Sequence, residues 1–233
     1  MQQLSLLEEK DSPPVQYWPG FLDSVEADRL FQESRALAWL QNQFPILGKL
    51  VPLPRLELMF GDSETYRYTY SGSVEFTAKP WPPFLADLRT QVEAFTGYHY
   101  QVGVGNLYRN GQDSIGYHSD DEPSLGKQPA IASLSLGATR TFRLKRKESG
   151  GQSYAYALSH GDLLLMQPGC QENWVHALPK TSKCCGIRIN WTFRPYATQE
   201  SAMRSDCLSP QQRVDRGHPG LVQPANYKVE EQT

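Results

Sequence analysis

The second half of the chain contains strand-like segments in close succession, and this pattern constrains the fold more than any other feature. Each segment is rich in aliphatic, aromatic or β-branched residues, and Gly or Pro turns separate several of them. The segments span residues 98–108, 130–136, 139–145, 154–158, 162–166 and 185–193. Many short strands in succession are typical of a β-sandwich, a barrel or a jelly roll.

Two helix-like segments precede these strands. Residues 24–39 carry apolar side chains at roughly helical spacing, with Ser24 as the expected N-cap. Residues 82–96 have one apolar face, prolines at the start and Gly97 directly after the end. Helices followed by strands favour a helical layer packed on a sheet, so we expect an α+β fold that is mainly β.

Composition excludes several classes of protein. The chain is 39% hydrophobic and 21% charged, which is typical of a globular protein, and its net charge of -2 argues against a wholly basic nucleic-acid binder. No apolar run approaches the roughly 20 residues of a membrane helix. Two of the cysteines, Cys184 and Cys185, are adjacent, which argues against a disulfide framework. We expect a monomer without a membrane partner in a reducing compartment, the cytoplasm, or the nucleus if the source is eukaryotic.

A possible metal site comes from two histidines and an aspartate. His118 and Asp120 are two residues apart, so in an extended chain both side chains point to the same side. His176 lies on a later element and could complete the set. Two imidazoles and one carboxylate leave open positions on the metal, as in non-heme Fe(II) oxygenases, and zinc accepts the same ligands. Histidines packed for structural reasons remain the alternative.

Polar side chains alternate along residues 186–194. Arg188, Asn190, Thr192 and Arg194 share one face of the expected strand, and the residues between them are apolar. Two arginines inside a small barrel require anionic partners. A dicarboxylate bound to the metal would satisfy both of them. The alternative is a solvated polar face on an edge strand.

Several ordered motifs resemble the AlkB family of 2-oxoglutarate- and Fe(II)-dependent dioxygenases. They are PRLELMFGD, YRYTYSG, NLYRNGQDSIGYHSDDEPSLG, IASLSLGATRTFRL, HGDLLLM, WVHALPK and RINWTFR, between residues 54 and 196. The resemblance implies a double-stranded β-helix (jelly roll) with supporting N-terminal helices and a nucleotide-recognition lid. We therefore expect a flexible N-terminus at 1–15, helices and lid at 16–97, the catalytic core at 98–196 and a C-terminal tail at 197–233.

The resemblance also implies a role for each residue of the expected site. His118, Asp120 and His176 match the iron ligands of the family. The expected contacts to 2-oxoglutarate are Arg188 and Tyr108 at the distal carboxylate, Arg194 and Asn106 at the metal-proximal carboxylate, and Asn190 and Thr192 along the wall. Tyr68 and Tyr70 match aromatic positions of the lid, and Glu122 matches the acidic residue that reads the exocyclic amine of the damaged base.

The activity that this resemblance implies is oxidative repair of N-alkylated bases in DNA and RNA. Fe(II), O2 and 2-oxoglutarate would remove the methyl group of 1-methyladenine or 3-methylcytosine, with release of formaldehyde, succinate and CO2. An aromatic lid residue would stack on the positively charged base. Two alternatives remain, namely an oxygenase of this superfamily that acts on a protein, lipid or small molecule, and a catalytically inactive nucleic-acid-binding module.

Two further segments are candidates for contact with nucleic acid. Arg140 begins a cluster of cations at residues 140–147 that is expected to contact phosphates. Ile46 and Leu47 lie in a short apolar segment where duplex-acting relatives carry a finger that wedges into the gap left by a flipped base. Packing of this segment on the core is the alternative, and the preference for single or double strands stays open.

Overall fold

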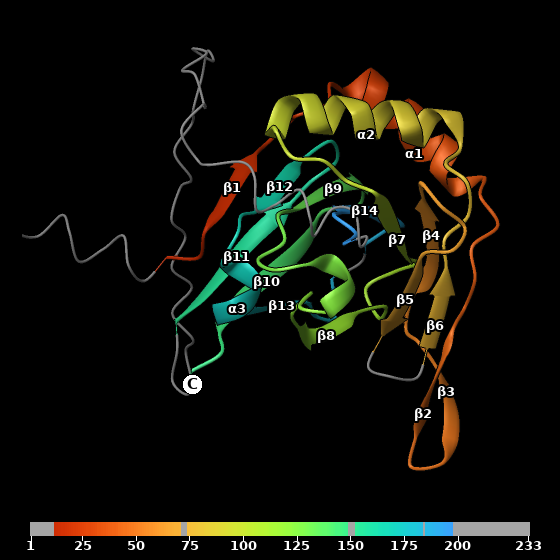
Figure 1. Ribbon diagram of the computed structural model, residues 1–233, viewed down its shortest axis with the longest axis vertical. Helices are drawn as coiled ribbons and strands as arrows, with labels where there is room; N and C mark the ends of the chain where they lie inside the picture. Colours follow the sequence, from red (N-terminus) through yellow and green to blue (C-terminus); the bar gives the residue numbers. More distant parts are fainter. Residues whose placement is uncertain (1–11, 71–73, 149–151, 184, 198–233) are drawn as a thin grey trace, which may run out of the picture.

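The computed structural model describes residues 12–70, 74–148, 152–183 and 185–197 (Figure 1). The expected flexible N-terminus and C-terminal tail therefore fall largely outside the described residues. Pro14 and Val15 lie within the range expected to be flexible, but they belong to the fold. The backbone N–H of Gln167 donates to the carbonyl of Pro14 at 2.8 Å, and Val15 pairs with Met166 of β12. Within the described residues, no helix has the length and apolar character needed to cross a membrane.

Two antiparallel sheets form the body of the protein. The larger sheet has six strands in the order β1 (Val15–Trp18), β12 (Leu163–Met166), β9 (Ile131–Gly137), β14 (Arg188–Arg194), β7 (Val102–Tyr108) and β4 (Leu56–Gly61). The smaller sheet has four strands in the order β11 (Ser153–Leu158), β10 (Arg140–Arg146), β13 (Trp174–Leu178) and β8 (Ile115–His118). From β7 to β14 the chain passes repeatedly between the two sheets, which confirms the expected jelly roll.

The predicted strands are present, with shifted ends. Segment 98–108 becomes a strand only at Val102, and segment 185–193 only at Arg188. Two strands of the larger sheet, β1 and β4, lie outside the segments predicted from periodicity, because each is short and pairs only with strands distant in sequence.

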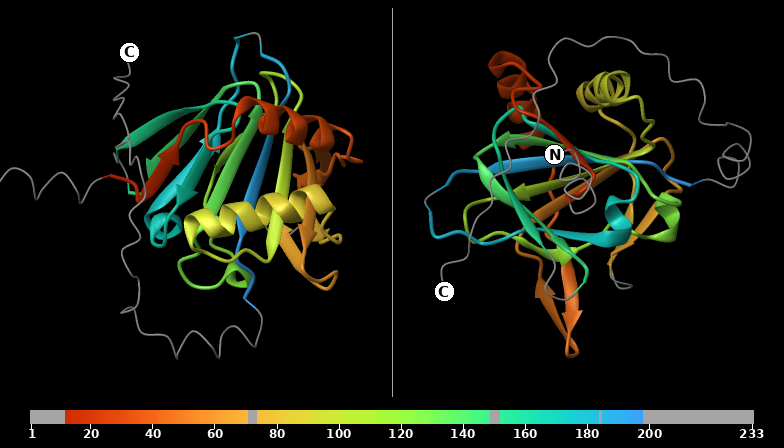
Figure 2. Two further views of the ribbon diagram at one scale, coloured as in Figure 1. Left: turned by 90° about the horizontal axis from the view of Figure 1, so that it is seen from above. Right: turned by 90° about the vertical axis from the view of Figure 1, so that its left-hand side faces the viewer.

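Both predicted helices cover the outer face of the larger sheet, opposite the smaller sheet (Figure 2). α2 (Pro83–Thr96) is close to the prediction and ends at Gly97, whose φ of 74° is left-handed. α1 (Ser24–Arg35) is shorter than predicted, because the chain beyond it turns and Leu40 pairs with β4. Its N-cap is Asp23, not Ser24, since the Asp23 carboxylate accepts a hydrogen bond from the backbone of Glu26 at 2.9 Å.

The main core lies between the larger sheet and the helices. Ile189, Trp191 and Phe193 on the outer face of β14 are fully buried there, as the alternation predicted. Gly105 on the neighbouring strand permits this packing, because a Cβ atom at that position would lie 2.5 Å from the Trp191 ring. The inner face of β14 is therefore left for polar side chains between the two sheets.

Two hairpins and two short helices complete the described fold. The β2–β3 hairpin (Gln43–Ile46 and Lys49–Pro52) projects from the body, and the β5–β6 hairpin (Arg67–Tyr70 and Val74–Thr77) lies between it and the sheets (Figure 1). The 3₁₀ helix Pro123–Leu125 follows β8, and α3 (Cys170–Asn173) precedes β13.

Candidate metal centre and adjoining pocket

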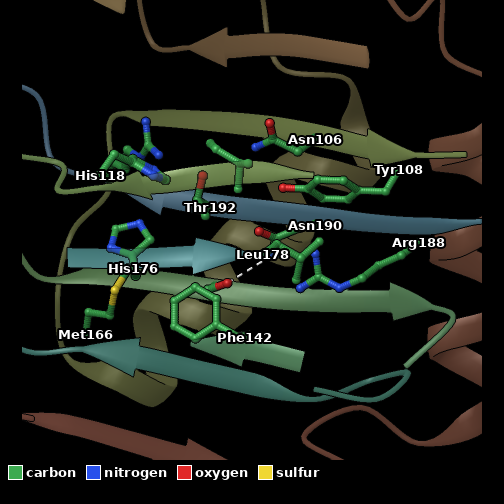
Figure 3. Close-up of a pocket in the computed structure, with 13 residues that line it drawn as sticks. Asn106, Tyr108, His118, Phe142, Met166, His176, Leu178, Arg188, Asn190 and Thr192 are labelled. Carbon is green, nitrogen blue, oxygen red and sulfur yellow. Dashed lines mark hydrogen bonds between the residues drawn. The ribbon is translucent and has the colours of Figure 1, made fainter. Parts of the chain in front are cut away.

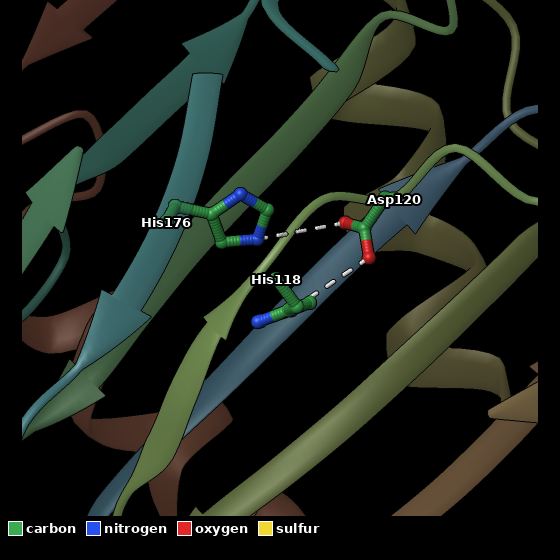
Figure 4. Close-up of side chains that lie close together, drawn as sticks. All are labelled: His118, Asp120 and His176. Atoms are coloured by element: carbon green, nitrogen blue, oxygen red, sulfur yellow. Dashed lines mark ion pairs between the residues drawn. The ribbon is translucent and has the colours of Figure 1, made fainter. Parts of the chain in front are cut away.

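The two histidines of the predicted metal site face each other across neighbouring strands. His118 is the last residue of β8, and His176 lies directly opposite it on β13 (Figure 4). Asp120 follows two residues after His118, where the chain has left the strand. Antiparallel pairing of two strands that are far apart in sequence thus brings all three side chains together.

The three side chains fit a divalent metal ion. Their candidate ligand atoms lie within 4.8 Å of one another. Nε2 of His118 lies 3.8 Å from Oδ1 of Asp120, and Nε2 of His176 lies 3.8 Å from Oδ2. Two atoms that each bind one ion at about 2.1 Å can be up to about 4.2 Å apart. Both distances to Asp120 therefore allow a shared ion, and Fe(II) accepts this donor set with positions left open.

Both imidazoles are held in the neutral form that a metal requires. Burial lowers the pKa of His118 and lowers the pKa of His176 to about 3. Nδ1 of His118 lies 2.9 Å from the carbonyl oxygen of Gly116. Because a carbonyl only accepts hydrogen bonds, Nδ1 carries the proton and Nε2 presents its lone pair toward Asp120.

Asp120 is held in place by two further residues. It is fully buried, and its backbone N–H donates to Oε1 of Gln171 on α3 at 3.0 Å. Nη2 of Arg194 lies 3.1 Å from Oδ2 of Asp120. Arg194 is thus next to the candidate metal site, where its expected contact is the metal-proximal carboxylate of 2-oxoglutarate. Gln171 was not predicted, because no sequence pattern links it to Asp120.

A pocket between the two sheets contains all of the predicted 2-oxoglutarate contacts. Its lining residues are Asn106, Tyr108, Ile115, His118, Ser133, Phe142, Met166, His176, Leu178, Arg188, Asn190, Thr192 and Arg194. Figure 3 shows the two histidines at one end and Arg188 with Tyr108 at the other. A cation at the end remote from the metal ligands suits a ligand with carboxylates at both ends.

The surroundings of Arg188 also suit a bound carboxylate. The residue is 1% exposed, and its Nη2 donates to the Ser135 hydroxyl at 2.8 Å. Its Nε atom has no hydrogen-bond partner among the described residues, and burial lowers its pKa to about 10. Its guanidinium lies 5.5 Å from the centre of the Tyr108 ring. A buried cation held mainly by neutral groups is stabilised by an anion, so Arg188 fits the distal carboxylate of 2-oxoglutarate.

The side chains of the expected wall residues, Asn190 and Thr192, form hydrogen bonds with other groups of the protein. The Asn190 amide donates to the Ser133 hydroxyl at 2.9 Å and to the Leu134 carbonyl at 2.8 Å. The Thr192 hydroxyl donates to the Val104 carbonyl at 3.0 Å. These bonds fix the shape of the pocket between its two ends. The two serines of β9 that serve as partners were not predicted, although their alternation in IASLSL placed them on one face.

The residues expected to contact the nucleotide lie on three different segments. Tyr68 and Tyr70 are on β5, and their side chains fall outside the described part of the structure. Glu122 is half-buried in the loop between Asp120 and the 3₁₀ helix. The side chain of Ile46 is also outside the described part. Leu47 is 98% exposed at the tip of the β2–β3 hairpin, so the alternative of core packing is wrong for this residue.

Arg140 does not fit the predicted contact with phosphate. It is 3% exposed, because buried and exposed side chains alternate along β10 and Arg140 points inward. Its guanidinium donates to the backbone carbonyls of Asn110, Asp113 and Pro179, at 3.0, 2.9 and 2.7 Å. These bonds join the loops at one end of the pocket, so we assign Arg140 a structural role.

Comparison with known proteins agrees with this geometry. The model of the 2OG-Fe(II) oxygenase superfamily matches residues 14–194. Alpha-ketoglutarate-dependent dioxygenase alkB homolog 3 from Bos taurus is 40% identical over 185 residues, a match that covers 76% of this chain and 64% of that protein. DNA oxidative demethylase ALKBH2 from Homo sapiens is 37% identical over 185 residues, covering 73% of this chain and 69% of that protein.

A solved structure supports the fold assignment. The structure of OsALKBH1 superposes with a TM-score of 0.57 at 19% identity, covering 78% of this chain and 98% of that chain. The superfamily uses Fe(II), 2-oxoglutarate and O2, and the His118–Asp120–His176 cluster is a group of side chains that could hold the metal ion. The chain therefore belongs to the AlkB family of the 2OG-Fe(II) oxygenase superfamily.

Proposed function

We propose that this protein is an oxidative demethylase that removes N-methyl groups from 1-methyladenine and 3-methylcytosine in DNA and also in RNA. The observation that carries the proposal is the pocket with the His–Asp–His cluster at one end and the buried Arg188 at the other. The names of the two relatives, a dioxygenase and a DNA oxidative demethylase, support the substrate class. Because the match spans 64% of the alkB homolog 3 relative, its substrates are carried over as a proposal.

Within the pocket, each residue has a task that follows from its position. Iron and 2-oxoglutarate, when bound, supply with O2 the oxidation that turns the N-methyl group into formaldehyde and the cosubstrate into succinate and CO2. Arg188 and Tyr108 hold the distal carboxylate of the cosubstrate. Arg194 and Asn106 face its other carboxylate, next to Asp120. The apolar side chains of the smaller sheet keep water away from the reacting end.

The proposed nucleotide contacts come from three segments of the chain, namely the loop after Asp120, β5 and the β2–β3 hairpin. Glu122 follows Asp120 by two residues, and its carboxylate accepts a hydrogen bond from the exocyclic amine of a methylated base. Tyr68 and Tyr70 on β5 stack on the base, which carries positive charge. Leu47 at the exposed hairpin tip inserts beside the flipped nucleotide when the substrate is a duplex. A base that cannot pair because of its methyl group costs less free energy to flip out.

The oligomeric state and the cellular compartment complete the proposal. We propose that the protein acts as a monomer, because every predicted metal and cosubstrate residue comes from one chain. We further propose that it works in a reducing compartment, the cytoplasm or, in a eukaryote, the nucleus, because Cys170 and Cys185 are free thiols.

The deciding experiment is a demethylation assay under controlled oxygen. The protein is loaded with Fe(II) and 2-oxoglutarate without oxygen, and oxygen is then added with a short oligonucleotide that carries one 1-methyladenine or 3-methylcytosine. Loss of the methyl group in step with succinate formation is the expected result. Succinate without demethylation would instead favour a protein, lipid or small-molecule substrate. Bound iron without either product would favour a binding module.

A further inference from the structure

A buried ion pair lies beside the pocket and has no part in the roles described so far. Arg55 immediately precedes β4 and Glu57 lies on it, and their side chains are 4% and 5% exposed. Nη2 and Nε of Arg55 each lie 2.8 Å from Oε1 of Glu57. A buried ion pair seldom adds much stability compared with apolar residues of the same size, so its presence here calls for another explanation.

The pair contacts one of the pocket residues directly. Glu57 pairs with Asn106 in the register of β4 and β7, and Nε of Arg55 donates to Oδ1 of Asn106 at 3.0 Å. A guanidinium has only donors, so the amide of Asn106 must turn its oxygen toward Arg55. The remaining group of the amide, Nδ2, is then the one available to the pocket that Asn106 lines.

Glu57 in turn holds Arg55 in this position. Its Oε1 accepts two bonds from the guanidinium, which balances the charge of Arg55 and draws it toward β4. Its second oxygen, Oε2, accepts a bond from the Asn42 amide at 3.0 Å. Asn42 directly precedes β2, so the same carboxylate also anchors the base of the exposed hairpin.

We propose that Arg55, held by Glu57, is a positioning residue that fixes the Asn106 amide with Nδ2 toward the pocket, where it donates a hydrogen bond to a carboxylate of 2-oxoglutarate. A freely rotating amide would present its oxygen to the anionic cosubstrate for part of the time. The fixed amide avoids that repulsion and the entropy cost of ordering the side chain on binding. The inference rests on the cosubstrate site of the proposed function and does not depend on the nucleic acid.

The test measures cosubstrate binding without turnover. Protein loaded with Mn(II) is titrated with 2-oxoglutarate under nitrogen by calorimetry, with no nucleic acid present. Arg55→Lys keeps the charge that balances Glu57 but removes the rigid fork that also reaches Asn106. We expect the Kd for 2-oxoglutarate to rise roughly 5- to 20-fold, less than for complete loss of a hydrogen bond to a charged group, because the Asn106 amide is still present. An unchanged Kd would overturn the proposal.

A double-mutant cycle shows whether Arg55 acts through Asn106. Asn106→Ala alone weakens binding, and Arg55→Lys added to Asn106→Ala should weaken it no further. Additive losses would mean that Arg55 has a general structural role and would overturn the proposal. Arg89→Lys is the matched control, because Arg89 also pairs with a carboxylate, that of Asp62, but lies on α2 away from the pocket. Its Kd should equal that of the wild type.

A second variant covers the case in which Arg55→Lys does not fold. Arg55→Met combined with Glu57→Leu replaces the ion pair by apolar side chains of similar size, a change that is often neutral or stabilising. This double variant should melt near the wild-type temperature and show the same rise in Kd. Wild-type affinity in the folded double variant would overturn the proposal. A wild-type protein that binds no 2-oxoglutarate would overturn the cosubstrate site itself, whereas failure of the oligonucleotide assay alone would leave this inference intact.

Discussion

His118 and His176 lie directly opposite each other on β8 and β13, with ring centroids 4.3 Å apart, although many residues separate them in the sequence. The pairing of these two strands therefore creates the candidate metal site, and Asp120 completes the cluster from the adjoining loop. Strand pairing depends on the backbone, whereas metal binding depends on the side chains. Replacing a ligand should therefore abolish metal binding and leave the paired strands intact.

Removal of a metal ligand should abolish turnover and leave the fold intact. His118→Ala deletes the ligand at the end of β8, and the half-buried position tolerates a smaller side chain. We expect demethylation and succinate formation to fall below detection, with a far-UV circular dichroism spectrum like that of the wild type. Asp120→Asn should behave in the same way. Normal activity in either variant would contradict the metal assignment.

Arg188→Met should separate cosubstrate binding from stability. The loss of a hydrogen-bonded charge should raise the KM for 2-oxoglutarate roughly 10- to 150-fold, while the KM for the oligonucleotide changes little. Since the unliganded protein buries this cation mainly against neutral groups, its melting temperature should stay the same or rise. Steady-state kinetics with each substrate varied give the two KM values, and a thermal melt gives the melting temperature. Parallel changes in both KM values would argue against a distal-carboxylate role.

The hairpin tip should matter for duplex substrates. Leu47→Ser together with Leu50→Ser changes two side chains that are 98% and 67% exposed, so the melting temperature should not fall. We expect repair of double-stranded oligonucleotides to fall more than repair of single strands. Val25→Ser on α1, where Val25 is 78% exposed, is the matched control and should affect neither. Equal losses on both substrates would argue against a wedge.

Tyr196, near the end of the described chain, should influence substrate binding through the β5–β6 hairpin. The Tyr196 ring stacks on Tyr66 with centroids 4.2 Å apart, and its hydroxyl accepts from the backbone N–H of Arg67 and donates to the Arg67 carbonyl. Tyr196→Phe keeps the stacking and removes both bonds at the start of β5. The KM for the methylated oligonucleotide should rise roughly 2- to 10-fold, with the Kd for 2-oxoglutarate unchanged. A rise in that Kd would show a wider structural effect.

Acid stability should depend on Asp113. Burial raises the pKa of this carboxyl, but hydrogen bonds from the Arg109 side chain and backbone outweigh it and hold the pKa below its ordinary value of 3.8. A group with a lowered pKa stabilises the fold above its unfolded pKa, and that contribution is lost as the pH falls through the folded value. Asp113→Asn should therefore cost about 2 kcal/mol at pH 7 and much less near pH 2.

Thermal melts of the wild type and Asp113→Asn across this pH range check the prediction. The difference in melting temperature should narrow steadily below about pH 4. A difference that is independent of pH would mean that packing, and not the charge of Asp113, stabilises this loop.

Sequence periodicity predicted the faces of the central strand but not every inward-facing residue. The alternation from Arg188 to Arg194 identified the polar face correctly, because successive side chains of a strand point to opposite sides. The same rule applied to β10 would have placed Arg140 inside, but its positive charge suggested the surface. Arg140 is buried because it donates hydrogen bonds to backbone carbonyls of Asn110 and Pro179. These carbonyls belong to loops that follow other strands, so the sequence of β10 does not reveal them.

By itself, the sequence determined the succession of strands, the spacing of His118 and Asp120, the polar stripe of β14 and, through ordered motifs, the family. These features depend on neighbours along the chain, whose geometry the backbone fixes. Only the tertiary structure decided that Glu57 and Arg55 hold Asn106, that Gln171 supports Asp120 and that Leu47 stands free in solvent. Those relationships arise from pairing and packing between distant segments, and local periodicity carries no information about which distant strands will meet.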